Sequence, residues 1–219
     1  MPTLSEENYL KAIFHLGYGH SDGVSTNAIA YKMDTKASSA TDMVKKLAEK
    51  QLVNYKKYQG AKLTEQGRQA AVAVIRKHRL WETFLVEKLN FSWDEVHQVA
   101  EQLEHVESEK LIDELDAYLD FPKFDPHGHP IPDKNGHIHK TEKLKLSQAP
   151  IPNTYICVGV NDSSAEFLQY LDKIGIALGT PIKVLSKEVF DESLTISIGG
   201  GQVHISKLVA SNLYVNFNH

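Results

Sequence analysis

The stretch VSTNAIAYKMDTKASSATDMVKKLAEKQLVNYKKYQGAKLT, residues 24–64, decides the fold of the amino-terminal part of this chain. Apolar residues recur at helical spacing on both sides of Asp34 and Thr35, so the pattern predicts two short helices joined by a tight turn. Two short strands are expected next, about residues 53–58 and 61–64, around a turn at Gln59 and Gly60. A basic hairpin directly after such a helix pair is typical of a wing, so this stretch predicts a winged helix-turn-helix.

Charge is segregated along the chain, although the formal net charge is only -4. Basic residues exceed acidic ones by eight between residues 31 and 80, and acidic residues exceed basic ones by ten between residues 81 and 120. The basic lobe indicates a polyanionic partner and the acidic lobe indicates cations, unless both are only solvated faces. The single cysteine, Cys157, excludes an internal disulfide and a cysteine zinc finger, so a metal site must use His and carboxylate ligands.

The composition also limits the class of protein. A length of 219 residues with 42% hydrophobic content allows one or two domains and excludes intrinsic disorder. No apolar run approaches the ~18 residues of a membrane-spanning helix, and the first residues lack the basic and apolar regions of a signal peptide. We therefore expect a cytoplasmic protein without a membrane partner.

Helical periodicity continues on both sides of the quoted stretch. A helix is expected over residues 5–17 with Ser5 as its N-cap, and a long helix over residues 65–89. Ser92 and Glu95 have the spacing of a capping box, which predicts the start of another helix.

The carboxyl-terminal part of the chain changes character after an irregular, proline-rich segment at residues 121–153. Short alternating stretches separated by Gly, Pro and Asp predict a small β-barrel with one helix, about 65 residues long. The expected fold class is a multidomain chain, mainly α with a small β part. The expected domains are residues 1–75 for the winged helix-turn-helix, 76–145 for a helical domain and 150–219 for the barrel.

Four potential metal ligands share one face of the helix that begins near Ser92. They are His97, Glu101, Glu104 and His105, whose spacing at about 100° per residue keeps them within roughly a 100° arc. The preceding long helix carries His78 and Glu82 at i and i+4, so two antiparallel helices could present their ligands to one another. Imidazole and carboxylate ligands suit divalent Mn, Fe, Co, Ni or Zn, and the absence of thiolate favours the harder metals. The alternative is an ordinary solvated pair, since Glu and His at i and i+4 are common on exposed helices.

The order of these elements, with the strings RKHRLWETFL (76–85), VHQVAEQLEHV (96–106) and PHGHPIP (126–132), resembles the diphtheria toxin repressor and manganese transport regulator family. The resemblance covers nearly the whole chain, and its His-x-x-x-Glu and His-x-x-x-Glu-x-x-Glu-His motifs are more specific than a winged helix alone. It implies a homodimer with an amino-terminal winged helix-turn-helix, a central helical domain for dimerisation and metal binding, and a carboxyl-terminal barrel like the SH3 fold.

The resemblance also implies two metal sites in each subunit. The primary regulatory site corresponds to Asn8, Glu101, Glu104 and His105. The ancillary site corresponds to His78, Glu82 and His97, and Asp162 is the candidate for the carboxylate that the barrel adds in some relatives. Without the metal, Glu82, Glu101 and Glu104 are expected to repel one another.

Three positions are informative when this chain is compared with the resembling family, and the first of them, Glu101, is as in the manganese-type relatives. Glu101 stands where iron-type relatives place a Cys, and a hard carboxylate there favours Mn(II) or Fe(II). Asn8 offers a neutral carbonyl oxygen where relatives have Met or Asp. Lys11 stands where manganese-type relatives carry a second carboxylate on the first helix, so we expect that their paired-ion cluster does not form.

The implied function is a Mn(II)- or Fe(II)-activated repressor of metal-uptake genes that binds a palindromic operator in double-stranded DNA. The candidates for contact with base edges are Ser38, Ser39, Thr41 and Asp42. The candidates for phosphate contact are Lys36, Lys45, Lys46, Lys56, Lys57 and Lys62.

Two rival functions and one further metal hypothesis stay open. A winged-helix regulator could respond to an organic effector, and the same ligands could serve a metallohydrolase. No nucleophile or general base stands apart from the ligand group, so we expect no enzymatic activity and no small organic substrate. The histidines of the proline-rich segment could bind a second metal, although packing in the link to the barrel is the favoured interpretation. They are His127, His129, His137 and His139.

Overall fold

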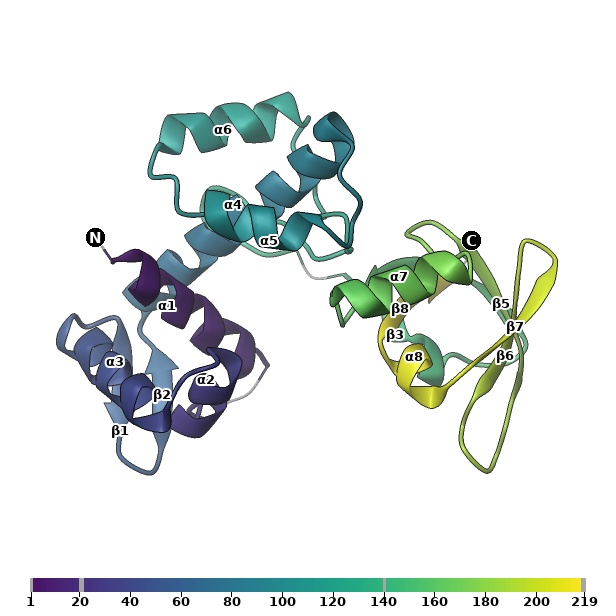
Figure 1. The fold of residues 1–219 in the computed structure, drawn as a ribbon, viewed down its shortest axis with the longest axis horizontal. Helices are drawn as coiled ribbons and strands as arrows, with labels where there is room; N and C mark the ends of the chain where they lie inside the picture. Colours follow the sequence, from purple (N-terminus) through teal and green to yellow (C-terminus); the bar gives the residue numbers. More distant parts are fainter. Residues whose placement is uncertain (1, 20–21, 140, 218–219) are drawn as a thin grey trace. The chain divides into compact units, whose positions relative to one another are not determined.

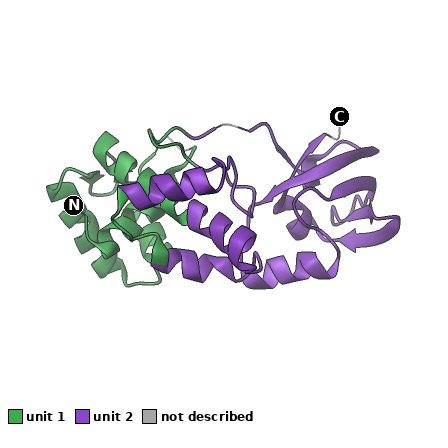
Figure 2. Ribbon diagram, turned by 90° about the horizontal axis from the view of Figure 1, so that it is seen from above, with its two compact units in different colours: residues 1–78, 103–109, 132–137 green, residues 79–102, 110–131, 138–219 purple. Residues whose placement is uncertain are grey.

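The computed structural model describes residues 2–19, 22–139 and 141–217, which belong to two compact units. Figure 2 colours unit 1, residues 1–78, 103–109 and 132–137, and unit 2, residues 79–102, 110–131 and 138–219. The boundary falls inside one long helix, between His78 and Arg79.

Unit 1 is built on the predicted winged helix-turn-helix (Figure 1). Its elements are α1 (Leu4–Gly17), α2 (Thr26–Lys32), α3 (Ala37–Glu49), β1 (Val53–Lys56), β2 (Gly60–Leu63) and the first part of α4 (Glu65–Leu89). The apolar faces of the first three helices meet in a core that includes the fully buried Leu10, Ile29 and Leu47. The predicted helices and hairpin are confirmed.

The wing is tied to the helical core at its base. Val24 and Ala61 exchange two backbone hydrogen bonds of 2.9 and 2.8 Å. Gly60 has φ +83, and a Cβ on it would lie 2.6 Å from the carbonyl oxygen of Val24. Only glycine allows this close approach. The base of the hairpin is therefore fixed to the helical core, while Lys57 and Tyr58 at its tip are exposed.

Helix α1 has a different N-cap from the one predicted. Thr3, and not Ser5, is the N-cap residue: its hydroxyl accepts the Glu6 N–H at 3.4 Å, and the Glu6 carboxylate accepts the Thr3 N–H at 2.8 Å. The prediction of Ser5 was wrong because Thr3 with Glu6 completes a reciprocal capping box, which satisfies two donors where Ser5 could satisfy one.

Glu6 is also one of the fully buried carboxylates of unit 1. Lys50 lies 2.8 Å and Lys46 3.1 Å from its Oε1. Burial alone would raise the pKa of Glu6, but Lys50, the Thr3 N–H and Lys46 together lower it to about 2. The ion pairs therefore fasten α3 to the start of α1.

The helical part of unit 2 contains the rest of α4 and nearly all of α5 (Val96–Leu103) and of α6 (Glu109–Tyr118). Leu80 packs with Ile112 and Ile131 in a small core of its own. The helix expected from Ser92 begins only at Val96, because residues 93–95 form a turn, and the Ser92 N–H still donates to Glu95 Oε2 at 3.3 Å. Among the described residues, no helix combines the length and apolarity that crossing a membrane requires.

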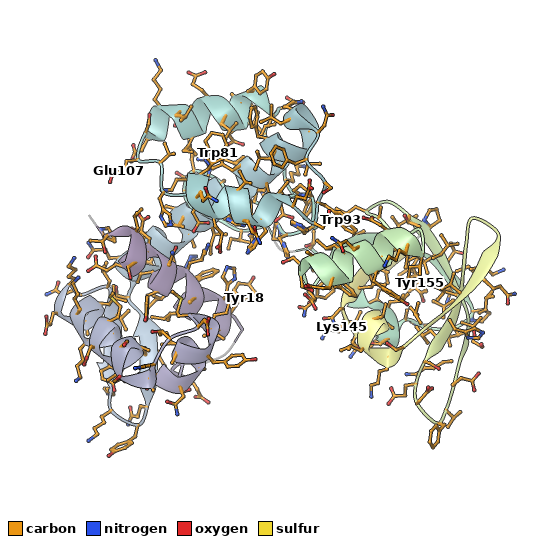
Figure 3. All side chains as sticks on the ribbon, in the orientation of Figure 1. Tyr18, Trp81, Trp93, Glu107, Lys145 and Tyr155 are labelled. Carbon is orange, nitrogen blue, oxygen red and sulfur yellow. The ribbon has the colours of Figure 1, made fainter. Side chains whose placement is uncertain are left out.

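The carboxyl-terminal part of unit 2 is an antiparallel sheet with strand order β3-β8-β4-β5-β6-β7. The strands are β3 (Leu144–Lys145), β4 (Asn153–Val160), β5 (Pro181–Lys187), β6 (Leu194–Ile198), β7 (Gly201–Ile205) and β8 (Leu213–Phe217). Tyr155, labelled in Figure 3, is fully buried in its core and donates its hydroxyl to the Pro150 carbonyl at 2.7 Å. The predicted barrel is confirmed, but it has two α-helices and not one: α7 (Ala165–Lys173) and the short α8 (Lys207–Ser211), which is capped by Ser206.

The proline-rich segment fastens this barrel to the helices of unit 2. The Val160 N–H donates to the His127 carbonyl at 2.9 Å. A Cβ on Gly128 would lie 2.1 Å from the Val158 carbonyl oxygen, so the two backbones touch. Trp93 contributes an indole N–H to the Asp172 carboxylate at 3.1 Å. The segment that contains His127 is thus part of the packed structure.

Glu6→Gln should test the ion pairs of Glu6. Because the folded pKa is lowered, these pairs stabilise the fold above pH 4.5 and lose their contribution as the pH falls toward about 2. We expect the variant to lose about 2 kcal/mol of unfolding free energy at pH 7, with the difference from wild type vanishing near pH 2. Urea denaturation over this pH range measures it, with the exposed Glu49→Gln as control. Equal stability of wild type and Glu6→Gln at pH 7 would contradict the assignment.

Candidate metal centres

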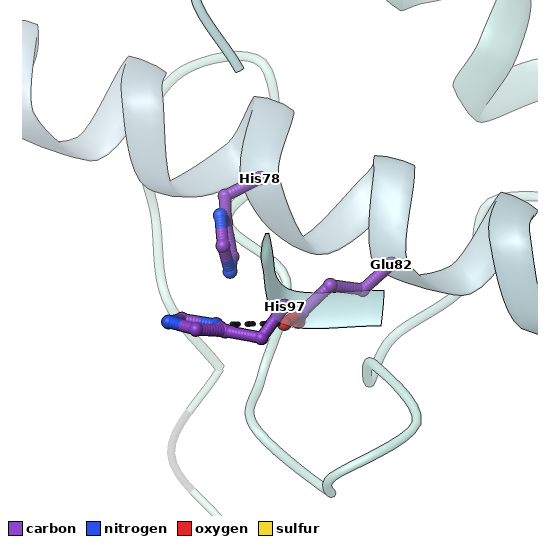
Figure 4. A group of neighbouring side chains, drawn as sticks. All are labelled: His78, Glu82 and His97. Carbon is purple, nitrogen blue, oxygen red and sulfur yellow. Dashed lines mark hydrogen bonds and ion pairs between the residues drawn. The ribbon is translucent and has the colours of Figure 1, made fainter. Parts of the chain in front are cut away.

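The first group of potential ligands joins α4 to α5. His78, Glu82 and His97 offer ligand atoms that all lie within 4.8 Å of one another (Figure 4). His97 Nδ1 is 3.3 Å from Glu82 Oε1. Glu82 is buried whereas His97 is half exposed, so the group has one face toward solvent. The three residues assigned by resemblance to the ancillary site are thus brought together.

His127 adds a contact to this group that the sequence did not indicate. Its side chain is 1% exposed, its Nδ1 lies 3.5 Å from Glu82 Oε2, and its Nε2 lies 2.7 Å from the Trp93 carbonyl oxygen. Burial alone would lower the pKa of His127, but the carboxylates of Glu82 and Asp125 raise it above its usual value. His127 also forms a second potential ligand group with Asp125 and His129. Sequence spacing alone cannot find such a contact, because a turn and a backbone contact to the barrel position the ring.

Glu104 is the most buried carboxylate among the predicted ligands. It follows the end of α5, and its side chain has no exposed surface. Lys11 Nζ of α1 lies 2.6 and 2.8 Å from its two oxygens, and His78 Nδ1 lies 2.6 Å from Oε2. Burial would raise the pKa of Glu104, but His78 and Lys11 hold it below its usual value. His78 therefore contacts Glu104 and also belongs to the group with Glu82 and His97.

His105 contacts α1 at Glu7, the residue before Asn8. His105 Nδ1 lies 2.6 Å from Glu7 Oε2, and His105 Nε2 lies 3.7 Å from Glu104 Oε1. Asn8 Oδ1 is buried and accepts no hydrogen bond from the described residues. A buried carbonyl oxygen that accepts no hydrogen bond, on a helix that contacts an imidazole and a carboxylate, fits a hard divalent cation. Glu7 escaped the sequence analysis because no motif marks it.

Two predicted ligands, Glu101 and Asp162, belong to neither of the two potential ligand groups among the described residues. Glu101 is exposed on α5, where its Oε1 is 3.6 Å from His97 Nε2. Asp162 belongs to neither potential ligand group, and its Oδ1 accepts the Ser164 N–H at 2.9 Å before α7. Their assignment to the primary and ancillary sites stays a prediction.

The predicted DNA-contacting residues lie on the helix-turn-helix and the wing. Thr41 is half-buried and donates its hydroxyl to the Ala37 carbonyl at 2.7 Å, and the others are exposed. Lys46 is engaged with the buried Glu6, and Lys45 is 3.6 Å from Asp42. The exposed basic residues are Lys36, Lys45, Lys46, Lys56, Lys57 and Lys62, and the exposed polar ones are Ser38, Ser39 and Asp42.

The first helix of the winged helix-turn-helix thus contacts imidazole and carboxylate groups, the side-chain types that bind divalent metals. Three family models match successive segments of the chain. They are the N-terminal DNA binding domain of iron dependent repressors (residues 1–61), their metal binding and dimerisation domain (64–133), and the FeoA domain (144–216).

Individual relatives agree with these models. The iron-dependent repressor IdeR of Mycobacterium tuberculosis is 36% identical over 128 residues, 58% of this chain and 54% of that protein. The regulator MntR of Oceanobacillus iheyensis is 33% identical over 129 residues, 57% of this chain and 84% of that protein. A manganese-dependent transcriptional repressor in complex with manganese superposes with a TM-score of 0.88 and 36% identity, over 97% of this chain and 100% of that one.

This chain belongs to the diphtheria toxin repressor and manganese transport regulator family of metal-dependent transcriptional repressors. The match spans about half the length of the IdeR proteins. IdeR, MntR and the manganese-dependent repressor named above are all transcriptional regulators.

Glu82→Gln tests the first ligand group. Loss of its charge removes the anionic member of His78, Glu82 and His97, so we expect one fewer Mn(II) bound per subunit in calorimetric titration of chelator-treated protein. Glu87→Gln on the same helix, where Glu87 is half exposed and pairs with Lys88, should bind as wild type does. An unchanged Mn(II) count in folded Glu82→Gln would remove this group from the metal sites.

Proposed function

We propose that this chain is a cytoplasmic, Mn(II)- or Fe(II)-activated repressor of metal-uptake genes that binds a palindromic DNA operator as a homodimer. One observation carries the proposal: Glu104 and His105, in the segment that matches the metal-binding model, contact Lys11 and Glu7 of α1, in the segment that matches the DNA-binding model. Metal binding and the position of the DNA-binding domain are therefore coupled through α1.

Two ions per subunit are proposed. Asn8, Glu101, Glu104 and His105 would hold the regulatory ion, and His78, Glu82 and His97 with one further acid, Asp162 or Asp125, the ancillary ion. A bound divalent cation supplies positive charge that neutralises the carboxylates. Carboxylate and amide oxygens favour Mn(II) and Fe(II), and the similar repressor structures with manganese and with zinc support a site of this ligand type.

Regulation then follows as thermodynamic linkage. Occupation of the regulatory site would favour the arrangement of α1 in which Asn8 joins Glu104 and His105. To change the ratio of DNA-competent to DNA-incompetent protein from 1:99 to 99:1, the ion must bind the competent form about 5.5 kcal/mol more favourably. By reciprocity, operator DNA tightens metal binding.

Dimerisation is proposed to use the helical part of unit 2, which exposes large apolar side chains. They are Leu89, Leu111, Tyr118, Phe121 and Phe124, each between 37% and 66% exposed. A twofold dimer would place two recognition helices, α3 and its symmetry mate, on a palindrome. Ser38, Ser39, Thr41 and Asp42 are proposed to meet base edges, and Lys36, Lys45, Lys46, Lys56, Lys57 and Lys62 to meet phosphates. None of the relatives supports an organic effector or a hydrolase.

Glu104→Ala and His105→Ala test the regulatory site. Each should weaken Mn(II)-stimulated DNA binding by about a hundredfold or more while the protein stays a folded dimer. The assay is fluorescence anisotropy of the DNA upstream of the chain's own gene, with chelated protein and then with Mn(II), Fe(II) or Zn(II) added anaerobically. Glu107→Ala, which changes a nearby exposed carboxylate, is the control. Equally tight wild-type binding without any metal would refute metal activation.

Lys45→Ala tests the proposed phosphate interactions. We expect weaker binding to every DNA sequence and a salt slope, d log K/d log [salt], that is smaller in magnitude by about 0.9 for each phosphate that Lys45 neutralises, one in each half of a dimer. Lys88→Ala, which removes a charge from the acidic lobe, should leave the slope unchanged. An unchanged slope for Lys45→Ala would remove this residue from the DNA interface.

A further inference from the structure

Lys11 places a positive charge on the carboxylate that the regulatory ion needs. Its Nζ lies 2.6 and 2.8 Å from the two oxygens of Glu104, and the two side chains are 14% and 0% exposed. Both oxygens of Glu104 are engaged by this ammonium, and His78 Nδ1 shares Oε2 at 2.6 Å. A hydrogen-bonded ion pair of this kind satisfies a buried carboxylate by itself.

Glu6, the other fully buried carboxylate of unit 1, provides a comparison for the surroundings of Glu104. Glu6 also pairs with two lysines, Lys46 and Lys50, which are both exposed. Its other contact is the capping box at the start of α1. Glu104 instead has His105 Nε2 at 3.7 Å, and the buried, unsatisfied Asn8 Oδ1 lies on the same helix as Lys11. The Lys11 ammonium therefore lies among potential metal ligands, where Lys46 and Lys50 do not.

We propose that Lys11 is the resident counter-cation of Glu104, which a divalent ion must displace, and that Lys11 thereby sets the affinity of the regulatory site for that ion. The inference rests on the proposed function, because it takes Glu104 as a metal ligand. It adds that activation is an exchange of one cation for another at a single carboxylate.

The Lys11 ammonium and a divalent ion cannot bind the Glu104 carboxylate at the same time. An ammonium within 3 Å of both oxygens of Glu104 blocks the positions from which a divalent ion would bind them, and the like charges repel strongly at such separations. Lys11 has a long flexible stem and is not fully buried, so its ammonium can move to solvent when a metal takes its place.

The test is Mn(II) binding to the chelated full-length protein with Lys11→Met and Lys50→Met. Lys11→Met should bind Mn(II) about tenfold more tightly or better, with an unchanged number of ions. Lys50→Met removes the same charge from Glu6 and should leave affinity and ion count as in wild type.

Thermal unfolding supplies a second readout that involves no DNA. Metal-free Lys11→Met leaves Glu104 without its lysine and should melt lower than wild type, and its rise in melting temperature with Mn(II) should be larger, because no ion pair is broken on binding. If Lys11→Met does not fold, Lys11→Gln keeps a hydrogen-bond donor and removes the charge. Mn(II) affinity in either variant equal to or weaker than wild type would overturn the proposal, whereas wild-type protein that binds neither Mn(II) nor Fe(II) would overturn the proposed function itself.

Discussion

The fully buried carboxylate of Glu104 is the constraint on which the junction between the DNA-binding and metal-binding segments depends. A buried charge is tolerated only with opposite charge and hydrogen bonds around it. Lys11 from α1 and His78 from α4 supply both, at distances of 2.6 to 2.8 Å. Because these partners come from different elements, one carboxylate orients α1, α4 and the end of α5 together. A change in charge at Glu104 must therefore act on the first helix of the DNA-binding segment.

Glu82 repeats the same constraint with imidazoles as partners. His97 lies 3.3 Å and His127 3.5 Å from its oxygens, and the backbone of His127 in turn accepts a hydrogen bond from Val160 of the barrel. Through His127, the buried carboxylate of Glu82 thus connects the helices of unit 2 to its sheet. His78 stands one turn before Glu82 on α4, and its Nδ1 contacts Glu104 at 2.6 Å.

Local patterns predicted most of the fold, while long-range pairing decided the details of the site. Helices, hairpin and barrel follow from periodicity and turn residues, which are local signals. Thr3 and Glu6 have the same capping-box spacing as Ser92 and Glu95, so the sequence contained the signal for the cap of α1, and the prediction of Ser5 overlooked it. Helix α8 was missed because five residues carry too little periodicity. His78, Glu82 and His97 were found since helical spacing places them. The contacts of Lys11 with Glu104 and of Glu7 with His105 join residues 93 and 98 positions apart, for which the sequence contains no local signal.

These pairings reduce the net free energy expected for metal binding in the proposed switch. The sequence suggested that Glu82, Glu101 and Glu104 repel one another without a metal, so that binding would relieve strain. In the structure each buried member already has a cation or an imidazole, with Glu104 held by Lys11 and Glu82 by His97 and His127. Binding at Glu104 then exchanges partners, and its free energy is the difference between two satisfied states rather than the full attraction of a dication for bare carboxylates. A smaller net free energy means that the site fills only at higher free metal, which is the property a regulator needs if it must stay empty until the ion is abundant.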